Sequence, residues 1–165
     1  MINYPTKKLN EAETERRNPN NPINILHRYF ICANRMRIYF DEILEKHTKK
    51  EIDEKRFGIE STMYMSLWYG LLYVVIEGWG DLELKDGVID KLLQSKNTGL
   101  LKQYRNAVFH YPKTKKYNDD RFESFYKETT TVAWVRQLNK EFGRFFIEYF
   151  KKKEKITDQQ EMGRI

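Results

Sequence analysis

The chain has 165 residues, enough for one domain with a buried core, and carries a formal net charge of +6 with 40% hydrophobic residues. Its single cysteine, Cys32, excludes an internal disulfide and favours a reducing compartment. The first twenty residues contain no apolar stretch typical of a secretion signal, and the longest apolar run, residues 63–76, is shorter than the roughly 20 residues of a membrane helix. We therefore expect a cytoplasmic protein without a membrane segment.

The first half of the chain predicts a flexible arm followed by two long helices. Residues 1–20 are polar and form the predicted arm, and Asn21-Pro22 is a favourable helix start because it joins a capping amide to a first-turn proline. Apolar residues then recur at helical spacing to about His47. The second helix, expected over residues 59–79, is apolar nearly all round, which is typical of a central helix. In that helix Ser66 and Gly70 would allow another helix to approach closely.

The second half predicts shorter helices and a long final one. We expect a short helix over residues 88–94, a helix capped by Asn97-Thr98 and ended by Pro112, a helical segment from residue 119, and a last helix from about residue 131 to 149. No segment alternates with the period of a strand. The predicted fold is therefore all-α, an up-and-down bundle of four to five helices. Residues 21–152 would form its single domain, with a frayed tail at 153–165.

A polar motif lies near the end of the helix that Pro112 terminates. Arg105 and His110 are five positions apart, and Asn106 directly follows the arginine. Arginine is a permanently charged, forked donor for phosphate, and histidine exchanges protons near neutral pH. An arginine and a histidine held together are the minimum set of groups for cleaving RNA without a metal, because the 2′-hydroxyl of RNA is itself the nucleophile. The motif therefore predicts chemistry on RNA rather than DNA.

The charge around the motif also favours a polyanionic substrate. Seven basic residues and no acidic ones lie between Lys91 and Asn118, so this window carries more positive charge than the whole chain's excess. A local positive field attracts nucleic acid, although a solvated lysine-rich surface is the plainer alternative. Within this window we assign substrate contacts to Lys102 and Lys113, and also to Tyr104 and Tyr111, which could stack on bases or supply a hydroxyl.

The sequence Arg105-Asn106-Ala107-Val108-Phe109-His110 resembles the Arg-polar-x-x-x-His signature of HEPN-domain proteins, small helical modules of which many are ribonucleases. The resemblance covers the motif strictly and residues 22–150 more loosely. It implies a homodimer in which paired motifs face each other across the interface. A toxin branch of the family has a tyrosine two residues after the histidine, where this chain has Pro112. Two further candidate partners are an inhibitory antitoxin and a larger assembly that acts in defence or stress.

These observations lead to one preferred function and one alternative. The preferred function is a metal-independent endoribonuclease in which His110 is the acid or base, Arg105 the phosphate anchor and Asn106 the orienting residue. Glu77, the only charge between Ser61 and Gly80, is either an exposed residue in the last turn of its helix or, if it faces the motif helix, orients Arg105 or His110. No cluster has metal-ligand spacing, so no metal or cofactor is expected. The alternative is a non-catalytic helical module that binds RNA or a partner protein.

Overall fold

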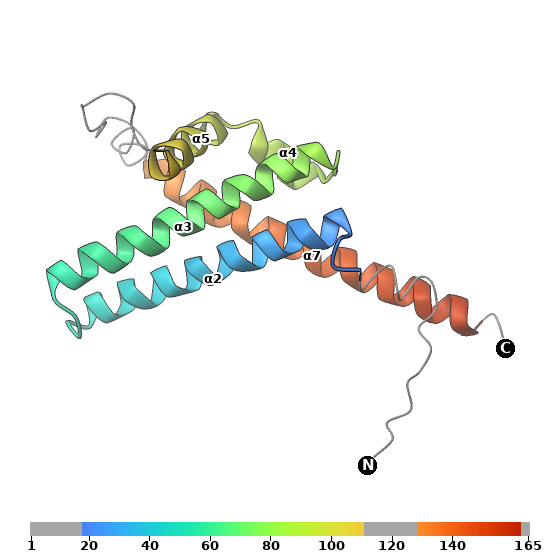
Figure 1. Cartoon of the computed structure of the whole chain (residues 1–165), viewed down its shortest axis with the longest axis horizontal. Coiled ribbons are helices and arrows are strands. Elements are labelled where there is room, and N and C mark those ends of the chain that lie inside the picture. Colours follow the sequence, from blue (N-terminus) through green and yellow to red (C-terminus); the bar gives the residue numbers. More distant parts are fainter. Residues whose placement is uncertain (1–17, 111–128, 163–165) are drawn as a thin grey trace, which may run out of the picture.

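The computed structural model describes residues 18–110 and 129–162, and in this part of the chain every regular element is a helix. The helices are α2 (Pro22–Thr48), α3 (Glu54–Asp81), α4 (Gly87–Leu93), α5 (Lys96–Phe109) and α7 (Thr129–Met162). In Figure 1, α2 and α3 run antiparallel and side by side, α5 lies against α3, and α7 crosses the pair and extends beyond it. The prediction of an all-helical fold is confirmed.

The long helices begin where polar side chains cap them. The side chain of Asn21 accepts a hydrogen bond from the backbone N–H of Ile23, and Pro22 occupies the first turn, as the sequence predicted for α2. Asp53 accepts a bond from the N–H of Arg56 and starts α3 earlier than expected. The predicted break at Gly58 is therefore wrong: this glycine lies inside α3, where no other atom crowds it.

Two other predicted boundaries also differ from the structure. The cap of the motif helix is Ser95 rather than Asn97, which is buried and accepts a hydrogen bond from Thr131. Helix α7 continues to Met162, so the tail predicted to be frayed from residue 153 is helical up to that residue. The helical segment expected from residue 119 and the flexible arm up to residue 17 lie outside the described residues.

Helix α3 is the centre of the core. Its side chains Trp68, Leu72 and Val75 are fully buried, and α7 contributes an apolar stripe to the same cluster. Of the described helices, α3 alone is long and apolar enough to span a membrane by length and composition. Burial of its apolar residues against neighbouring helices is what a central bundle helix requires. The absence of a membrane segment stays a prediction.

Small residues on α3 set how closely other helices approach. A Cβ atom on Gly70 would lie 2.0 Å from the ring of Phe109 in α5, and the hydroxyl of Ser66 hydrogen-bonds the hydroxyl of Tyr104 at 3.1 Å. Gly78 similarly leaves room for Leu26 of α2. The predicted close approach at Ser66 and Gly70 is confirmed, and it positions the last turns of α5, which carry the motif.

Candidate functional site

Arg105 lies between helices α5 and α3 and is tied to both. Its Nη2 atom donates to both carboxylate oxygens of Glu77, at 2.6 and 2.5 Å, and its Nη1 atom donates to Oδ1 of Asn106 at 3.0 Å. The guanidinium also lies 5.2 Å from the ring centre of Tyr73. With 22% of its side chain exposed, Arg105 is held by its neighbours yet still reaches solvent. Glu77 therefore faces the motif helix and contacts Arg105.

One donor of Arg105 has no partner. The Nε atom is buried and makes no hydrogen bond. Among the described residues, it is the one buried side-chain nitrogen or oxygen atom without a hydrogen-bond partner. Leaving a buried donor unpaired costs about 1–3 kcal/mol. Of the five N–H groups of the guanidinium, two point to Glu77 and one to Asn106, so a second hydrogen on Nη1 remains for a ligand.

His110 is the first residue beyond α5, not part of the helix. Its backbone is extended (φ −119°, ψ 122°), and its N–H donates to the carbonyl oxygen of Asn106 at 3.1 Å. The side chain is exposed, and none of the described residues hydrogen-bonds its imidazole. Asn106 thus contacts both members of the motif, one through its side chain and the other through its backbone. The second contact is the ordinary i→i−4 backbone bond of a helix end, so the orienting role of Asn106 stays a prediction.

The residues assigned to substrate contact have different positions. Tyr104 is fully buried against Tyr69, so its ring has no free face for a base, and its assignment to RNA stacking is wrong. Successive side chains of a helix point in different directions, so Tyr104 faces the core of the bundle although Arg105 follows it directly. Lys102 is exposed, as a phosphate contact requires. Tyr111 and Lys113 lie outside the described residues.

Tyr73 is a site residue that the sequence analysis missed. It lies one turn before Glu77 on α3 and stacks under the guanidinium of Arg105. Burial raises the pKa of the Tyr73 phenol, and the Glu77 carboxylate raises it further, so the hydroxyl is protonated at neutral pH. The available signal was its spacing of four residues from Glu77, the only charge between Ser61 and Gly80.

An apolar groove begins at the same carboxylate. It has a volume of about 310 Å3 and runs between the start of α2 and the end of α3, lined by Pro22, Ile25, Leu26, Tyr29, Val74, Glu77, Gly78, Asp81 and Leu82. Ile25 and Tyr29 are 37% and 43% exposed, which is high for large apolar side chains. Glu77 therefore joins two features, the Arg105 site and an uncovered apolar surface.

The site combines an anchored cation, Arg105, with an exposed imidazole, that of His110, five positions further along the chain. Within the described ranges, no group of three or more histidine, cysteine or carboxylate side chains is arranged to hold a metal ion. The site offers charge stabilisation from Arg105 and proton transfer from His110. Compared with protein-family models, curated proteins and solved structures, the chain matches none.

Proposed function

We propose that the protein is a metal-independent endoribonuclease of the HEPN type, with Arg105 and His110 as its catalytic residues. One observation carries the proposal. Arg105 is held by Glu77 and Asn106 with a free N–H, and the exposed imidazole of His110 follows on the same short stretch of chain. Holding catalytic groups in place before substrate binds is what makes charge stabilisation effective.

The reaction would proceed through attack by the RNA itself. A base removes the proton of a 2′-hydroxyl, the oxygen attacks the adjacent phosphorus, and the bond to the 5′-oxygen breaks as that oxygen is protonated. The products are a 2′,3′-cyclic phosphate and a 5′-hydroxyl. Arg105 would stabilise the extra negative charge on the phosphorane, and Lys102 would hold the strand.

Two proton transfers require two groups, and one chain supplies a single motif histidine. A two-fold homodimer provides both, with one His110 as base and the other as acid. The apolar groove is the surface that a second copy would cover, because its rim residue Glu77 is bonded to Arg105. Packing at this groove would bring the second motif to the Arg105 side of the molecule.

A non-catalytic module has one observation in its favour. The Glu77 carboxylate occupies both N–H groups of Arg105 Nη2, which leaves little of the guanidinium for phosphate. In this alternative the ion pair joins α3 to α5, and the protein binds RNA or a partner protein without cleaving it. The larger defence or stress assembly is compatible with either function.

An RNA cleavage assay in the presence of chelator distinguishes the two functions. We expect wild-type protein to cleave single-stranded RNA and to spare a strand with 2′-deoxyribose at the cut position. His110→Ala should lower the rate about 100-fold or more, as loss of a general acid or base does. Arg105→Ala should have an effect of similar size.

Matched controls exclude indirect effects and contaminants. Arg56→Ala removes an exposed arginine in a carboxylate pair, and His47→Ala removes a histidine stacked on Phe57, both near the N-terminal end of α3. Neither should change cleavage, and circular dichroism should show that all variants remain helical. RNA binding without cleavage by wild type would support the non-catalytic module. Equal cleavage by wild type and the motif variants would overturn the assignment of the site.

A further inference from the structure

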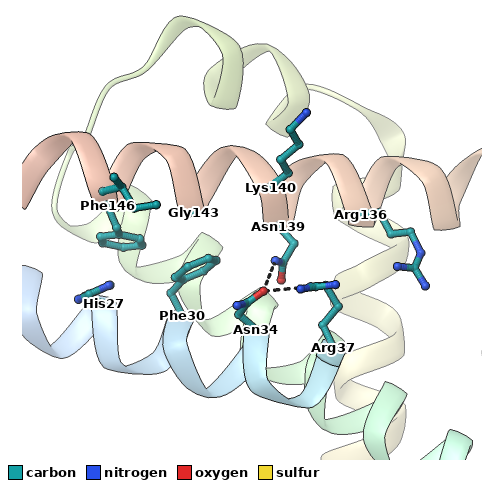
Figure 2. Close-up of a pocket in the computed structure, with 10 residues that line it drawn as sticks. His27, Phe30, Asn34, Arg37, Arg136, Asn139, Lys140, Gly143 and Phe146 are labelled. Carbon is teal, nitrogen blue, oxygen red and sulfur yellow. Dashed lines mark hydrogen bonds between the residues drawn. The ribbon is translucent and has the colours of Figure 1, made fainter. Parts of the chain in front are cut away.

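A cavity of about 410 Å3, the α2–α7 cavity, lies between helices α2 and α7. Figure 2 shows Asn139 and Arg37 hydrogen-bonded to the side-chain oxygen of Asn34, at 2.9 and 3.0 Å. The phenyl rings on its wall, those of Phe30 and Phe146, are 7% and 1% exposed and belong to the core. Its lining therefore serves the contact between two helices, and an accessible ring lies elsewhere, beside the motif.

Phe109 is this accessible ring. It ends α5, one residue before His110, and is 50% exposed. The Cε2–Cζ edge of the ring rests on Gly70 of α3, where a Cβ atom would overlap it. None of the described aromatic side chains stacks on Phe109. Because the contact with α3 uses one edge, the flat surface of the ring remains for a second planar group.

Phe109 shares one face of α5 with the groups assigned to phosphate binding. Four residues at positions i, i+3, i+4 and i+7 form a single stripe of the helix: Lys102, Arg105, Asn106 and Phe109. Phe109 follows Arg105 by about 6 Å along the helix axis. That separation is close to the span from a phosphate to the base of the adjoining nucleotide. The stripe therefore presents a cation and a ring at the spacing of a nucleotide.

The charge around this stripe favours a nucleic acid as the ligand. No acidic residue lies between Lys91 and Asn118, and Glu77, which comes from α3, is bonded to Arg105. A local positive field attracts a polyanion, and an exposed ring stacks on any base because every base has a π face. Bases in a duplex are already stacked on their neighbours, so only an unpaired base is available to Phe109.

We propose that Phe109 stacks on an unpaired base beside the phosphate that Arg105 binds. The inference rests on the proposed function, because it takes Arg105 as the phosphate anchor, and it makes single-stranded RNA the substrate class. Gly70 positions the ring, since any larger residue there displaces it. The stacked base is held alike before and during cleavage, so Phe109 contributes to KM rather than to kcat.

Binding of a single-stranded 2′-O-methyl RNA tests the base contact without cleavage, because this strand has no free 2′-hydroxyl. Fluorescence anisotropy of the labelled strand should show binding about tenfold weaker for Phe109→Ala and Phe109→Leu, as loss of one stacked base does. Phe109→Tyr should bind like wild type. Leucine keeps most of the apolar volume but has no flat face, so wild-type affinity of Phe109→Leu would overturn stacking.

Gly70→Ala moves the ring without removing it, and it should weaken RNA binding in the same direction. Gly58→Ala is the matched control in α3, because no atom lies within 4 Å of its Cβ position. Inorganic polyphosphate, which carries charge but no bases, should bind wild type and Phe109→Ala equally. Unchanged RNA binding by Gly70→Ala, weaker RNA binding by Gly58→Ala, or weaker polyphosphate binding by Phe109→Ala would each overturn the proposal.

Cleavage and assembly separate this inference from the nuclease proposal. With ordinary RNA, Phe109→Ala should raise KM about tenfold at unchanged kcat, whereas His110→Ala lowers kcat. RNA binding that depends on Phe109, without cleavage by wild type, would overturn the nuclease and support the base contact. Cleavage with the same KM for wild type and Phe109→Ala would overturn the base contact alone. A change from dimer to monomer on Phe109→Ala, seen by light scattering, would assign the ring to a contact between two copies and also overturn it.

Discussion

Arg105 has an environment that serves positioning more than stability. Its ion pair with Glu77 is partly exposed, and such pairs contribute at most about 1 kcal/mol. Its buried Nε atom has no partner in the described structure, which is a cost. If the only role of this pair were to join α3 to α5, apolar side chains would do so at a lower cost in folding free energy. The arrangement therefore favours a role for the guanidinium beyond packing.

Replacement of Glu77 tests this positioning role. Glu77→Gln removes the charge that holds Arg105, so we expect kcat for RNA cleavage to fall roughly tenfold. KM should stay level or fall, because a carboxylate that repels the RNA backbone is also removed. Steady-state kinetics measure both constants. Unchanged kcat would show that Glu77 does not position Arg105 for catalysis, and a raised KM would show that it contacts the substrate.

His27 makes the stability of the fold sensitive to mild acid. Burial lowers its pKa below the ordinary value of 6.5, so the folded state favours the neutral ring. Its contribution is fully present above pH 6.5 and is lost as the pH falls through the lowered pKa. We expect the free energy of unfolding, measured with urea, to drop between pH 7.5 and pH 5.5.

His27→Phe should reduce that pH dependence. A phenyl ring fits among Phe30, Phe146 and Phe150, which already surround the imidazole. The variant should therefore lose less stability than wild type over the same pH interval. If the free energy of unfolding falls equally in both proteins over this pH interval, another group is responsible for the acid sensitivity.

At the scale of elements, small residues on α3 determine how the helices pack. Gly78 and Gly80 lie two residues apart near the end of α3, but their surroundings differ. A Cβ on Gly78 would lie 2.5 Å from Cδ1 of Leu26, a side chain that is only 4% exposed. No atom lies within 4 Å of the corresponding position on Gly80. The two glycines thus form a matched pair.

The corresponding alanine variants should change stability in opposite directions. Gly78→Ala forces Leu26 to move within the core and should lower the free energy of unfolding by about 1–3 kcal/mol. Gly80→Ala adds helix propensity without a clash and should raise it by up to about 1 kcal/mol. Denaturant titration of both variants measures the difference. Equal effects would show that Gly78 does not control the contact between α2 and α3.

At the scale of the whole molecule, the proposed mechanism depends on a dimer. Light scattering should give the mass of two chains, and Ile25→Glu should convert the protein to a monomer because it places a charge in the apolar groove. The same variant should lose RNA cleavage while remaining folded. Ile59→Glu is the control: Ile59 is 61% exposed and does not line the groove. A wild-type monomer would remove the second histidine from the mechanism.

The helices themselves were largely predictable from local patterns. The start of α2 at Asn21-Pro22, the central position of α3 and the close approach at Ser66 and Gly70 all follow from residues near each other in the chain. Boundaries were less predictable where two capping residues competed. Ser95 caps α5 because the side chain of Asn97 is used by Thr131, a residue far along the chain.

The amino-acid sequence by itself determined the all-helical fold and the position of the Arg105–His110 motif, because periodicity and caps act within one or two turns. Only the tertiary structure decided which side chains meet. It brought Glu77 and Tyr73 to Arg105, buried Tyr104, and assembled the α2–α7 cavity around Asn34 and Asn139. Such contacts depend on how helices cross, and helix crossing is set by the packing of the whole core.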